Sequence, residues 1–132
     1  MTPTLDELLA AARRTRESAY APYSRFNVGA AVRAADGRTY TGCNVENASF
    51  GLTVCAERVA IFAAIAAGAR EIVELAVVTD VPEPAAPCGA CRQVLAEFSA
   101  GAEIALGNLD GKVVVTRLGD LLPMAFRLRE PR

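Results

Sequence analysis

The side chains best suited to chemistry in this sequence are three cysteines and one glutamate. Cys55 and Glu57 are two residues apart, and Cys88 and Cys91 are three apart in a Pro-Cys-x-x-Cys segment. The chain has no histidine, which excludes Ser-His-Asp and Cys-His nucleophilic catalysis and requires any metal site to be rich in thiolates. The sequence therefore predicts a tri-thiolate zinc site with a carboxylate beside it as the acid/base group.

Helix N-termini are expected to position the three cysteines. Two cysteines spaced by three residues share one face of a helix, and Pro87 fits the first turn, where its missing N–H costs nothing. Cys55 is expected at the start of another, alanine-rich helix. The partial positive charge of a helix N-terminus lowers thiol pKa values and favours the thiolate. Two facing helix N-termini would thus supply three thiolates to one ion.

Glu57 is not expected to be a ligand, because it lies roughly 200° around a regular helix from Cys55. In the first turn, however, its side chain can reach a water in the fourth tetrahedral position that three protein ligands leave open. Three thiolates and Zn²⁺ sum to one negative charge, which makes the metal a poorer Lewis acid. We hypothesise that Arg58 or Arg92 hydrogen-bonds to a thiolate sulfur and restores the electrophilicity of the zinc.

The cysteines taken alone leave other interpretations open. A lone Cys-x-x-Cys also occurs in structural zinc half-sites, in redox motifs and among buried core cysteines. A structural zinc site normally has four protein ligands, and Cys43 could supply the fourth thiolate. The position of Cys43 in an expected strand favours instead a small residue of the core or of the site wall.

The pattern around these residues predicts alternating helices and strands. The first helix is expected to take Thr4 as its N-cap, with Glu7 completing a capping box, and to end before Pro22. Strands are expected at 26–32, 39–45, 74–79, 104–106 and 112–116, and further helices at 54–67, 88–98 and 118–126. This order predicts an α/β fold, a three-layer α/β/α sandwich with a mixed five-stranded sheet.

Length and composition limit the possible partners. The 132 residues are expected to form one domain over 1–132, with a core at about 4–126 and a short C-terminal tail. A hydrophobic content of 52% favours an oligomer, and a net charge of −1 argues against nucleic-acid binding. The basic trio Arg13, Arg14 and Arg16 fits a solvated helix face. Neither a signal peptide nor an apolar run of membrane-spanning length is recognised, so we expect no membrane association and a cytoplasmic location.

Several segments resemble the cytidine deaminase family of small zinc enzymes. They are 23–31 (YSRFNVGAA), 44–49 (NVENAS), 55–58 (CAER), 87–94 (PCGACRQV) and 121–123 (LLP). The resemblance extends from the first helix to about Phe126. The zinc motif is common to the wider deaminase superfamily, whereas the NVEN segment is more specific, because it is similar to the ribose-binding element of enzymes that act on free nucleosides.

The resemblance implies a reaction and a role for each residue of the motif. Cys55, Cys88 and Cys91 would bind one Zn²⁺ per subunit, and Glu57 would take a proton from the zinc-bound water. The resulting hydroxide attacks C4 of cytosine, and Glu57 protonates N3 and then the leaving amine. The implied function is hydrolysis of cytidine and deoxycytidine to uridine and deoxyuridine, with release of ammonia, in pyrimidine salvage.

The same resemblance implies the substrate contacts. Asn44 and Glu46 would bind the ribose 3′-hydroxyl, and Phe26 would pack against the pyrimidine. Backbone groups of Ala56 and of the turn before Cys88 would hold the base edge. Read without the family, Phe26 at the head of an apolar strand is a core residue, and Asn44 and Glu46 are polar loop residues.

The all-cysteine ligand set resembles the homotetrameric branch of the family, in which each site borrows residues from neighbouring subunits. Ala48, Phe50 and Phe126 are the residues that this branch implies. Phe50 stands where the family more often has tyrosine, so a hydroxyl contact is lost while the packing of the ring can remain.

Two alternative functions are weighed against a nucleoside deaminase. One is deamination of a blasticidin-type nucleoside antibiotic or of a base within RNA; Glu46 and the net negative charge argue against it. The other is a structural-zinc module without catalysis, and Glu57 argues against that, because a structural site has no use for an acid/base group.

Overall fold

The computed structural model describes residues 3–99 and 101–128. Its helices are α1 (Pro3–Arg16), the 3-10 turn η1 (Phe50–Leu52), α2 (Ala56–Ala66), α3 (Gly89–Phe98) and α4 (Leu118–Leu121). Its strands are β1 (Gly29–Ala34), β2 (Thr39–Cys43), β3 (Ile72–Thr79), β4 (Glu103–Asn108) and β5 (Val113–Arg117). None of the described helices is both long and apolar enough to cross a bilayer.

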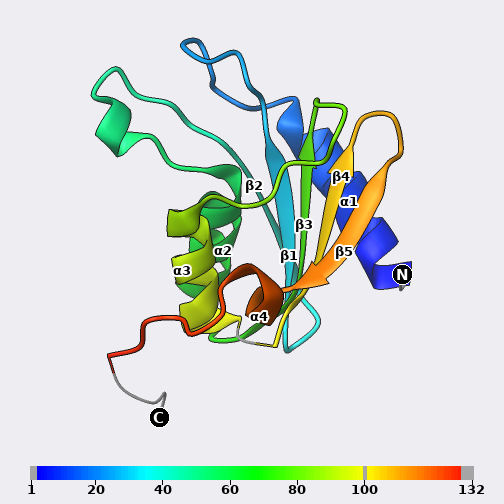
Figure 1. Ribbon diagram of the computed structural model, residues 1–132, viewed down its shortest axis with the longest axis vertical. Coiled ribbons are helices and arrows are strands. Elements are labelled where there is room, and N and C mark those ends of the chain that lie inside the picture. The colour runs from blue at the N-terminus through cyan, green and yellow to red at the C-terminus, as the bar shows by residue number, and fades with distance from the viewer. Residues whose placement is uncertain (1–2, 100, 129–132) are drawn as a thin grey trace.

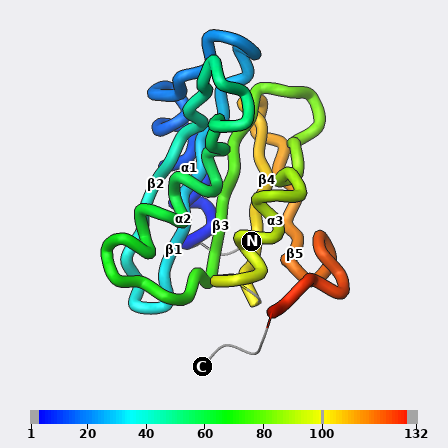
Figure 2. Tube along the Cα trace, turned by 90° about the vertical axis from the view of Figure 1, so that its left-hand side faces the viewer, coloured from blue at the N-terminus to red at the C-terminus, as the bar shows by residue number. Residues whose placement is uncertain are grey.

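The five strands form one mixed sheet in the order β2-β1-β3-β4-β5. Only β3 and β4 are parallel, and α3 provides the crossover that a parallel pair requires. Helix α1 covers one face of the sheet, whereas α2, α3 and α4 cover the other (Figure 1). Figure 2 shows α2 and α3 side by side on their face. The predicted three-layer sandwich with a mixed five-stranded sheet is confirmed.

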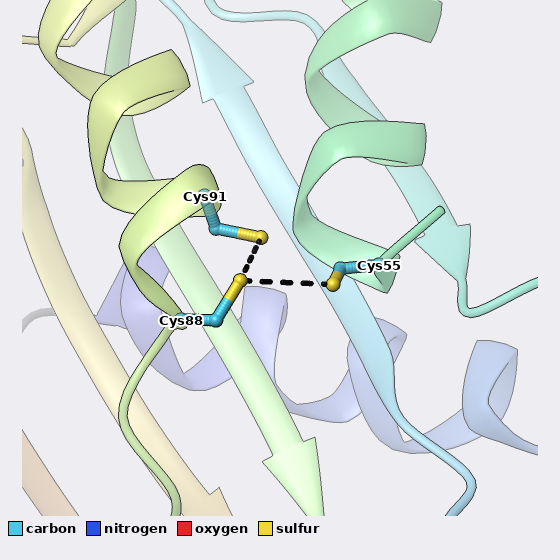
Figure 3. Close-up of side chains that lie close together, drawn as sticks. All are labelled: Cys55, Cys88 and Cys91. Carbon is cyan, nitrogen blue, oxygen red and sulfur yellow. Dashed lines mark hydrogen bonds between the residues drawn. The ribbon is translucent and has the colours of Figure 1, made fainter. Parts of the chain in front are cut away.

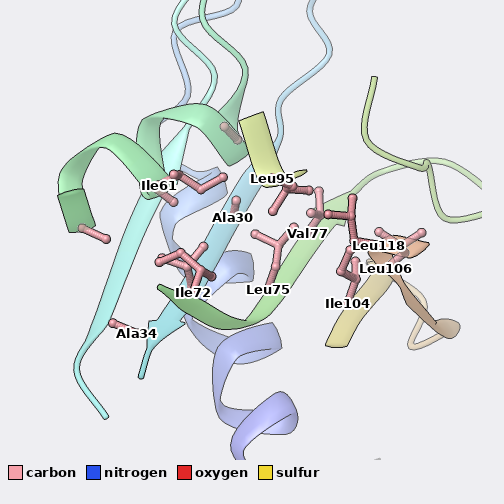
Figure 4. Close-up of a cluster of buried hydrophobic side chains, with 14 of the residues drawn as sticks. Ala30, Ala34, Ile61, Ile72, Leu75, Val77, Leu95, Ile104, Leu106 and Leu118 are labelled. Carbon is pink, nitrogen blue, oxygen red and sulfur yellow. The ribbon is translucent and has the colours of Figure 1, made fainter. Parts of the chain in front are cut away.

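The two faces of the sheet carry two separate hydrophobic cores, because side chains alternate along each strand. On one face, Leu5 and Leu8 of α1 pack with Ala31 of β1. On the other face, Ile61 of α2 and Leu95 of α3 belong to the larger core cluster (Figure 4). This larger core holds α2 and α3 on the same face, so their N-termini can meet.

Two glycines allow the helices to approach the sheet closely. A Cβ atom added to Gly29 of β1 would lie 1.9 Å from the carbonyl oxygen of Ala12 in α1. A Cβ atom added to Gly42 of β2 would lie 2.4 Å from the backbone nitrogen of Ala60 in α2. Only glycine fits where two backbones come this close. The contact at Gly42 sets the height of α2 over the sheet, and with it the position of Cys55.

Most elements differ from the sequence-based expectation at one end or both, and three of these differences are informative. Helix α1 begins at Pro3, so Thr4 lies inside the first turn, and its hydroxyl donates a hydrogen bond to Glu74 Oε2 (3.0 Å). Strand β1 begins at Gly29 rather than at residue 26. Helix α4 ends at Leu121 rather than at residue 126, because Pro123 disfavours a helical conformation at the residue before it.

Candidate metal centre and its cavity

The three cysteines lie at the N-terminal ends of α2 and α3. Cys55 is the N-cap residue of α2 and Cys88 that of α3, each with an extended backbone, and Cys91 lies in the first turn of α3. Their sulfur atoms point toward one another from the two helices (Figure 3). The N-terminal dipoles of both helices therefore favour negative charge on the sulfurs.

The spacing of the three sulfurs fits a zinc ion. The Sγ atoms of Cys55 and Cys88 are 3.8 Å apart, and those of Cys88 and Cys91 are 3.5 Å apart. All three lie within 4.8 Å of one another. Tetrahedral zinc with Zn–S bonds of about 2.3 Å separates its sulfur ligands by about 3.8 Å. The cluster is compatible with a zinc site.

Cys43 is not a member of this group within the described part of the chain. It ends β2 and is partly buried. The arrangement of a structural site with four thiolates is therefore absent from residues 3–99 and 101–128.

The thiol pKa values diverge within the cluster. Hydrogen bonding with Cys91 and with the Arg58 guanidinium lowers the pKa of Cys55 to about 5. The same interaction with Cys55, together with burial, raises the pKa of Cys91. A cluster that already favours one thiolate attracts a divalent cation, and the cation then displaces the remaining thiol protons.

The two arginines that follow the cysteines have different contacts. Arg58 donates from Nη2 to Cys55 Sγ at 3.4 Å, while its buried Nε has no hydrogen-bond partner among the described residues. Arg92 donates from Nε to the carbonyl of Pro87 (2.8 Å) and from Nη1 to the carbonyl of Leu121 (2.7 Å). Arg58 is thus the residue placed to act on thiolate charge, and Arg92 fixes the backbone just before Cys88.

Glu57 is buried, with 5% of its surface exposed, and lines a cavity together with Cys55 and Cys88. Burial raises the pKa of Glu57, and the negative charge of Cys55 acts in the same direction. A carboxyl group with a raised pKa holds a proton more readily than an exposed one, so it can accept a proton and later return it.

The same cavity brings in three of the predicted substrate residues. Phe26, Asn44 and Ala56 all contribute to its lining. Asn44 Oδ1 accepts a hydrogen bond from the Val28 N–H (2.9 Å), and its Nδ2 donates to the Phe26 carbonyl (2.7 Å). These bonds use half of the amide's hydrogen-bonding capacity, so Asn44 fixes the segment that carries Phe26 and can still bind a ligand.

Glu46 lies in a neighbouring cavity, with Tyr23, Ser24, Phe50 and Thr53. Its carboxylate accepts hydrogen bonds from the N–H groups of Tyr23 (2.9 Å) and Ser24 (3.2 Å) and from the Ser24 hydroxyl. These interactions, that of the hydroxyl foremost, lower the pKa of Glu46. Thr53 lines both cavities, so the two spaces adjoin.

The three residues assigned to neighbouring subunits lie at the surface of this chain. Ala48 is exposed, and Phe50 and Phe126 are 73% and 71% exposed. The Phe50 ring packs edge-on against Tyr23, with 5.6 Å between centroids. Among the described residues, none of the three lines the cavity that contains Glu57.

The structure adds cavity residues that the sequence did not single out. Val28, Thr53, Val77 and Thr79 line the cavity without a role expected from the sequence, whereas Ala85 and Ala86 belong to the turn before Cys88 that the resemblance assigns to the base edge. Most are small or apolar and carry no chemical signal of their own. The proline-rich spacing before Cys88 is the local signal in the sequence that this segment forms a defined wall.

Comparison with known proteins agrees with this geometry. Residues 3–106 match the family described as "Cytidine and deoxycytidylate deaminase zinc-binding region". A cytidine deaminase of Sporosarcina psychrophila is 50% identical over 123 residues, which cover 92% of this chain and 90% of the relative. That of Halalkalibacterium halodurans is 52% identical over 120 residues, covering 90% and 91%. The crystal structure of cytidine deaminase from Burkholderia pseudomallei superimposes with a TM-score of 0.88 at 53% identity, covering 96% of this chain and all of that one.

A mixed sheet with two helix N-termini converging on three thiols defines a zinc-binding deaminase fold. The chain belongs to the cytidine and deoxycytidylate deaminase family. The resemblance inferred from the sequence is thereby confirmed, and with it the prediction that the chain is an enzyme of the cytidine deaminase type.

Replacement of Cys91 by serine is expected to lower the zinc content by more than about tenfold, because a buried hydroxyl replaces a thiolate ligand. Metal analysis of the dialysed protein measures this. Cys43→Ser is the matched control and is expected to keep the wild-type zinc content. Zinc loss in the Cys43 variant with retention in the Cys91 variant would contradict the assignment of the cluster.

Proposed function

We propose that this protein is a zinc-dependent cytidine deaminase, which hydrolyses cytidine and deoxycytidine to uridine and deoxyuridine and releases ammonia. The observation that carries the proposal is the shared cavity of Cys55, Cys88 and Glu57, in which a buried carboxyl adjoins the three-thiol cluster. A structural zinc site has no need of such a group. The family match and the cytidine deaminases at about half identity support the substrate class.

The proposed mechanism assigns proton transfer to Glu57. When the three cysteines hold zinc, the metal supplies the Lewis acidity that makes a water acidic near neutral pH. The Glu57 carboxylate takes up one proton of the water that attacks C4 and gives it to N3 of the ring. It then takes the proton of the new C4 hydroxyl and gives it to the amino nitrogen, so that the C4–N bond breaks, the C4 carbonyl forms and ammonia leaves. Burial of Glu57 suits this role, because it stabilises the protonated carboxyl between the two transfers.

Substrate binding is proposed to use both adjoining cavities. The pyrimidine would lie in the cavity of Phe26 and Ala56, and the ribose would extend past Thr53 toward Glu46. Asn44 and Glu46 would then share the 3′-hydroxyl. That hydroxyl is present in both ribose and deoxyribose, so recognition at this position accounts for acceptance of both nucleosides.

Arg58 is proposed to tune the charge of the zinc site. Its Nη2 contact with Cys55 Sγ withdraws electron density from a thiolate ligand. Without such a contact, three thiolates would leave the zinc with a net negative charge and a weaker effect on bound water.

We also propose that four subunits assemble, with Phe50 and Phe126 completing the sites of neighbours. Support comes from their high exposure, since large aromatic side chains open to water usually mark an interface. A cytoplasmic location and a role in pyrimidine salvage are proposed as well, in keeping with free thiols and a free-nucleoside substrate.

The central test is ammonia release from cytidine and deoxycytidine, with and without a zinc chelator, for wild type and Glu57→Gln. The variant is expected to keep its zinc and to lose turnover by about a hundred- to ten-thousandfold, because the proton carrier is gone. Glu97→Gln, at an exposed site of α3, is the control and should match wild type. No ammonia from either nucleoside with wild type would exclude the proposed function.

Arg58→Gln is expected to reduce kcat about ten- to hundredfold, which corresponds to loss of a charge-assisted hydrogen bond to the thiolate. Steady-state kinetics and metal analysis check this together. Arg14→Gln removes an exposed arginine of α1 and should leave both quantities unchanged. Wild-type turnover and zinc content in the Arg58 variant would refute the charge-tuning role.

The oligomer is tested by sedimentation velocity. Wild type is expected to sediment as a species of four times the 13.9 kDa chain mass. The double variant Phe50→Ser, Phe126→Ser is expected to shift to smaller species, because it removes two apolar contacts. A wild-type monomer at micromolar concentration would contradict the assembly.

A further inference from the structure

Asn108, the last residue of β4, is a buried polar residue outside the site described above. Its Oδ1 accepts hydrogen bonds from the N–H groups of Asp110 (3.0 Å) and Lys112 (2.9 Å). Its Nδ2 donates to the carbonyls of Val81 (3.1 Å) and Pro82 (3.0 Å). An amide offers two acceptor positions and two N–H groups. All four are therefore in use, and the side chain joins two separate segments.

The two joined segments differ in function. Asp110 and Lys112 belong to the β4–β5 turn, which is remote from the cysteines in sequence. Val81 and Pro82 belong to the segment 80–88, which connects β3 to α3 and ends at the zinc-ligand candidate Cys88. Both segments lie at the same end of the sheet (Figure 1), because β3 and β4 run parallel and Thr79 is paired with Asn108 in register.

The segment 80–88 forms one wall of the catalytic cavity, through Ala85, Ala86 and Cys88. It has no regular secondary structure. Three of its residues are prolines, which have no N–H to donate and cannot be held by that group. At these three positions the backbone carbonyl is therefore the main-chain group through which the rest of the protein can hydrogen-bond to this wall.

The other contacts to this segment are weaker or lie at its ends. Ala85 N–H reaches Thr79 Oγ1 only at 3.5 Å. Glu83 pairs with Lys112, but both side chains are exposed, and exposed ion pairs contribute little. Arg92 holds the Pro87 carbonyl, at the far end. The bonds from the buried Asn108 side chain are part-buried and well formed, and they are thus the firmest contacts to the first half of the segment.

We propose that Asn108 is a positioning residue for substrate binding, which acts through the segment 80–88 on the wall formed by Ala85 and Ala86. It does not line the cavity itself and touches neither substrate nor metal. This inference rests on the proposed function, because it assigns that wall to the nucleoside base. It adds a determinant of substrate affinity far from the ligand motif in sequence.

The energetic consequence is a change in population. With both Asn108 hydrogen bonds formed, the segment 80–88 adopts the conformation that binds the base. Without them, only a fraction of the molecules adopts this conformation at a given time. The apparent dissociation constant rises by the inverse of that fraction. Saturating substrate restores the bound conformation, so kcat is preserved while KM increases. A purely structural role would instead reduce the amount of active enzyme, and so kcat, at constant KM.

The test uses Asn108→Asp in the full-length zinc-loaded protein. The aspartate retains an oxygen for the N–H groups of Asp110 and Lys112, but presents a second oxygen to the carbonyls of Val81 and Pro82. The β4–β5 turn therefore keeps its hydrogen bonds, whereas the two hydrogen bonds to the segment 80–88 are lost. Glu83→Gln is the matched control, because it removes the exposed ion pair between the same segment and Lys112.

The Asn108→Asp variant is expected to raise KM for cytidine about tenfold, in line with the loss of two neutral hydrogen bonds, with kcat within about twofold of wild type. Amide hydrogen exchange of the peptide spanning 80–88 is expected to accelerate in this variant and to stay at the wild-type rate in Glu83→Gln. Unchanged KM, or a fall in kcat alone, overturns the proposal.

Two further comparisons keep the outcome unambiguous. If Asn108→Asp does not fold, Asn108→Ser removes the amide without bringing a charge to the carbonyls, and the same changes in KM and in exchange are expected of it. Wild type that releases no ammonia from cytidine would defeat the proposed function. An active wild type whose Asn108 variants keep both the wild-type KM and the wild-type exchange rate would defeat this inference alone.

Discussion

The convergence of two helix N-termini is the constraint on which the rest of the structure depends. Three sulfur atoms can lie within 4.8 Å of one another only if α2 and α3 pack on the same face of the sheet with their starts adjacent. The larger core and the close backbone contact at Gly42 provide this. The sheet is thus a platform that sets the distance between two short segments, and small errors in helix height would separate the sulfurs.

The charges near the three thiols have two opposing effects on a zinc site. Helix dipoles and Arg58 favour thiolates, which bind zinc, yet too much thiolate charge weakens the metal as a Lewis acid. The arginine contact that stabilises the Cys55 thiolate is the same one to which we assign the withdrawal of charge from it. Glu57, two residues away, experiences burial and a neighbouring negative charge, and both favour its protonated form. The proposed proton carrier and the three-thiol cluster are therefore linked through one network of charge.

Much of this could be predicted from the sequence, because cysteine spacing and strand periodicity are local signals. The cysteine cluster, the arginine contact to sulfur and the sheet class follow from them. The placement of Glu46 does not: its carboxylate is engaged by the backbone of a loop 22 residues away, which local pattern cannot encode. The contacts of Asn108 are likewise not encoded in a local pattern, since its bonds to Val81 and Pro82 exist only once β3 and β4 pair.

The three prolines of the segment 80–88 have a consequence for the unfolded chain as well as for the folded one. Their rings fix φ, so this stretch has fewer conformations to lose when it orders. Part of the entropy cost of forming the cavity wall is therefore removed by covalent geometry before any tertiary contact is made. A wall with no regular secondary structure can in this way be as well defined as a strand, and hydrogen bonds from a few side chains are enough to complete it.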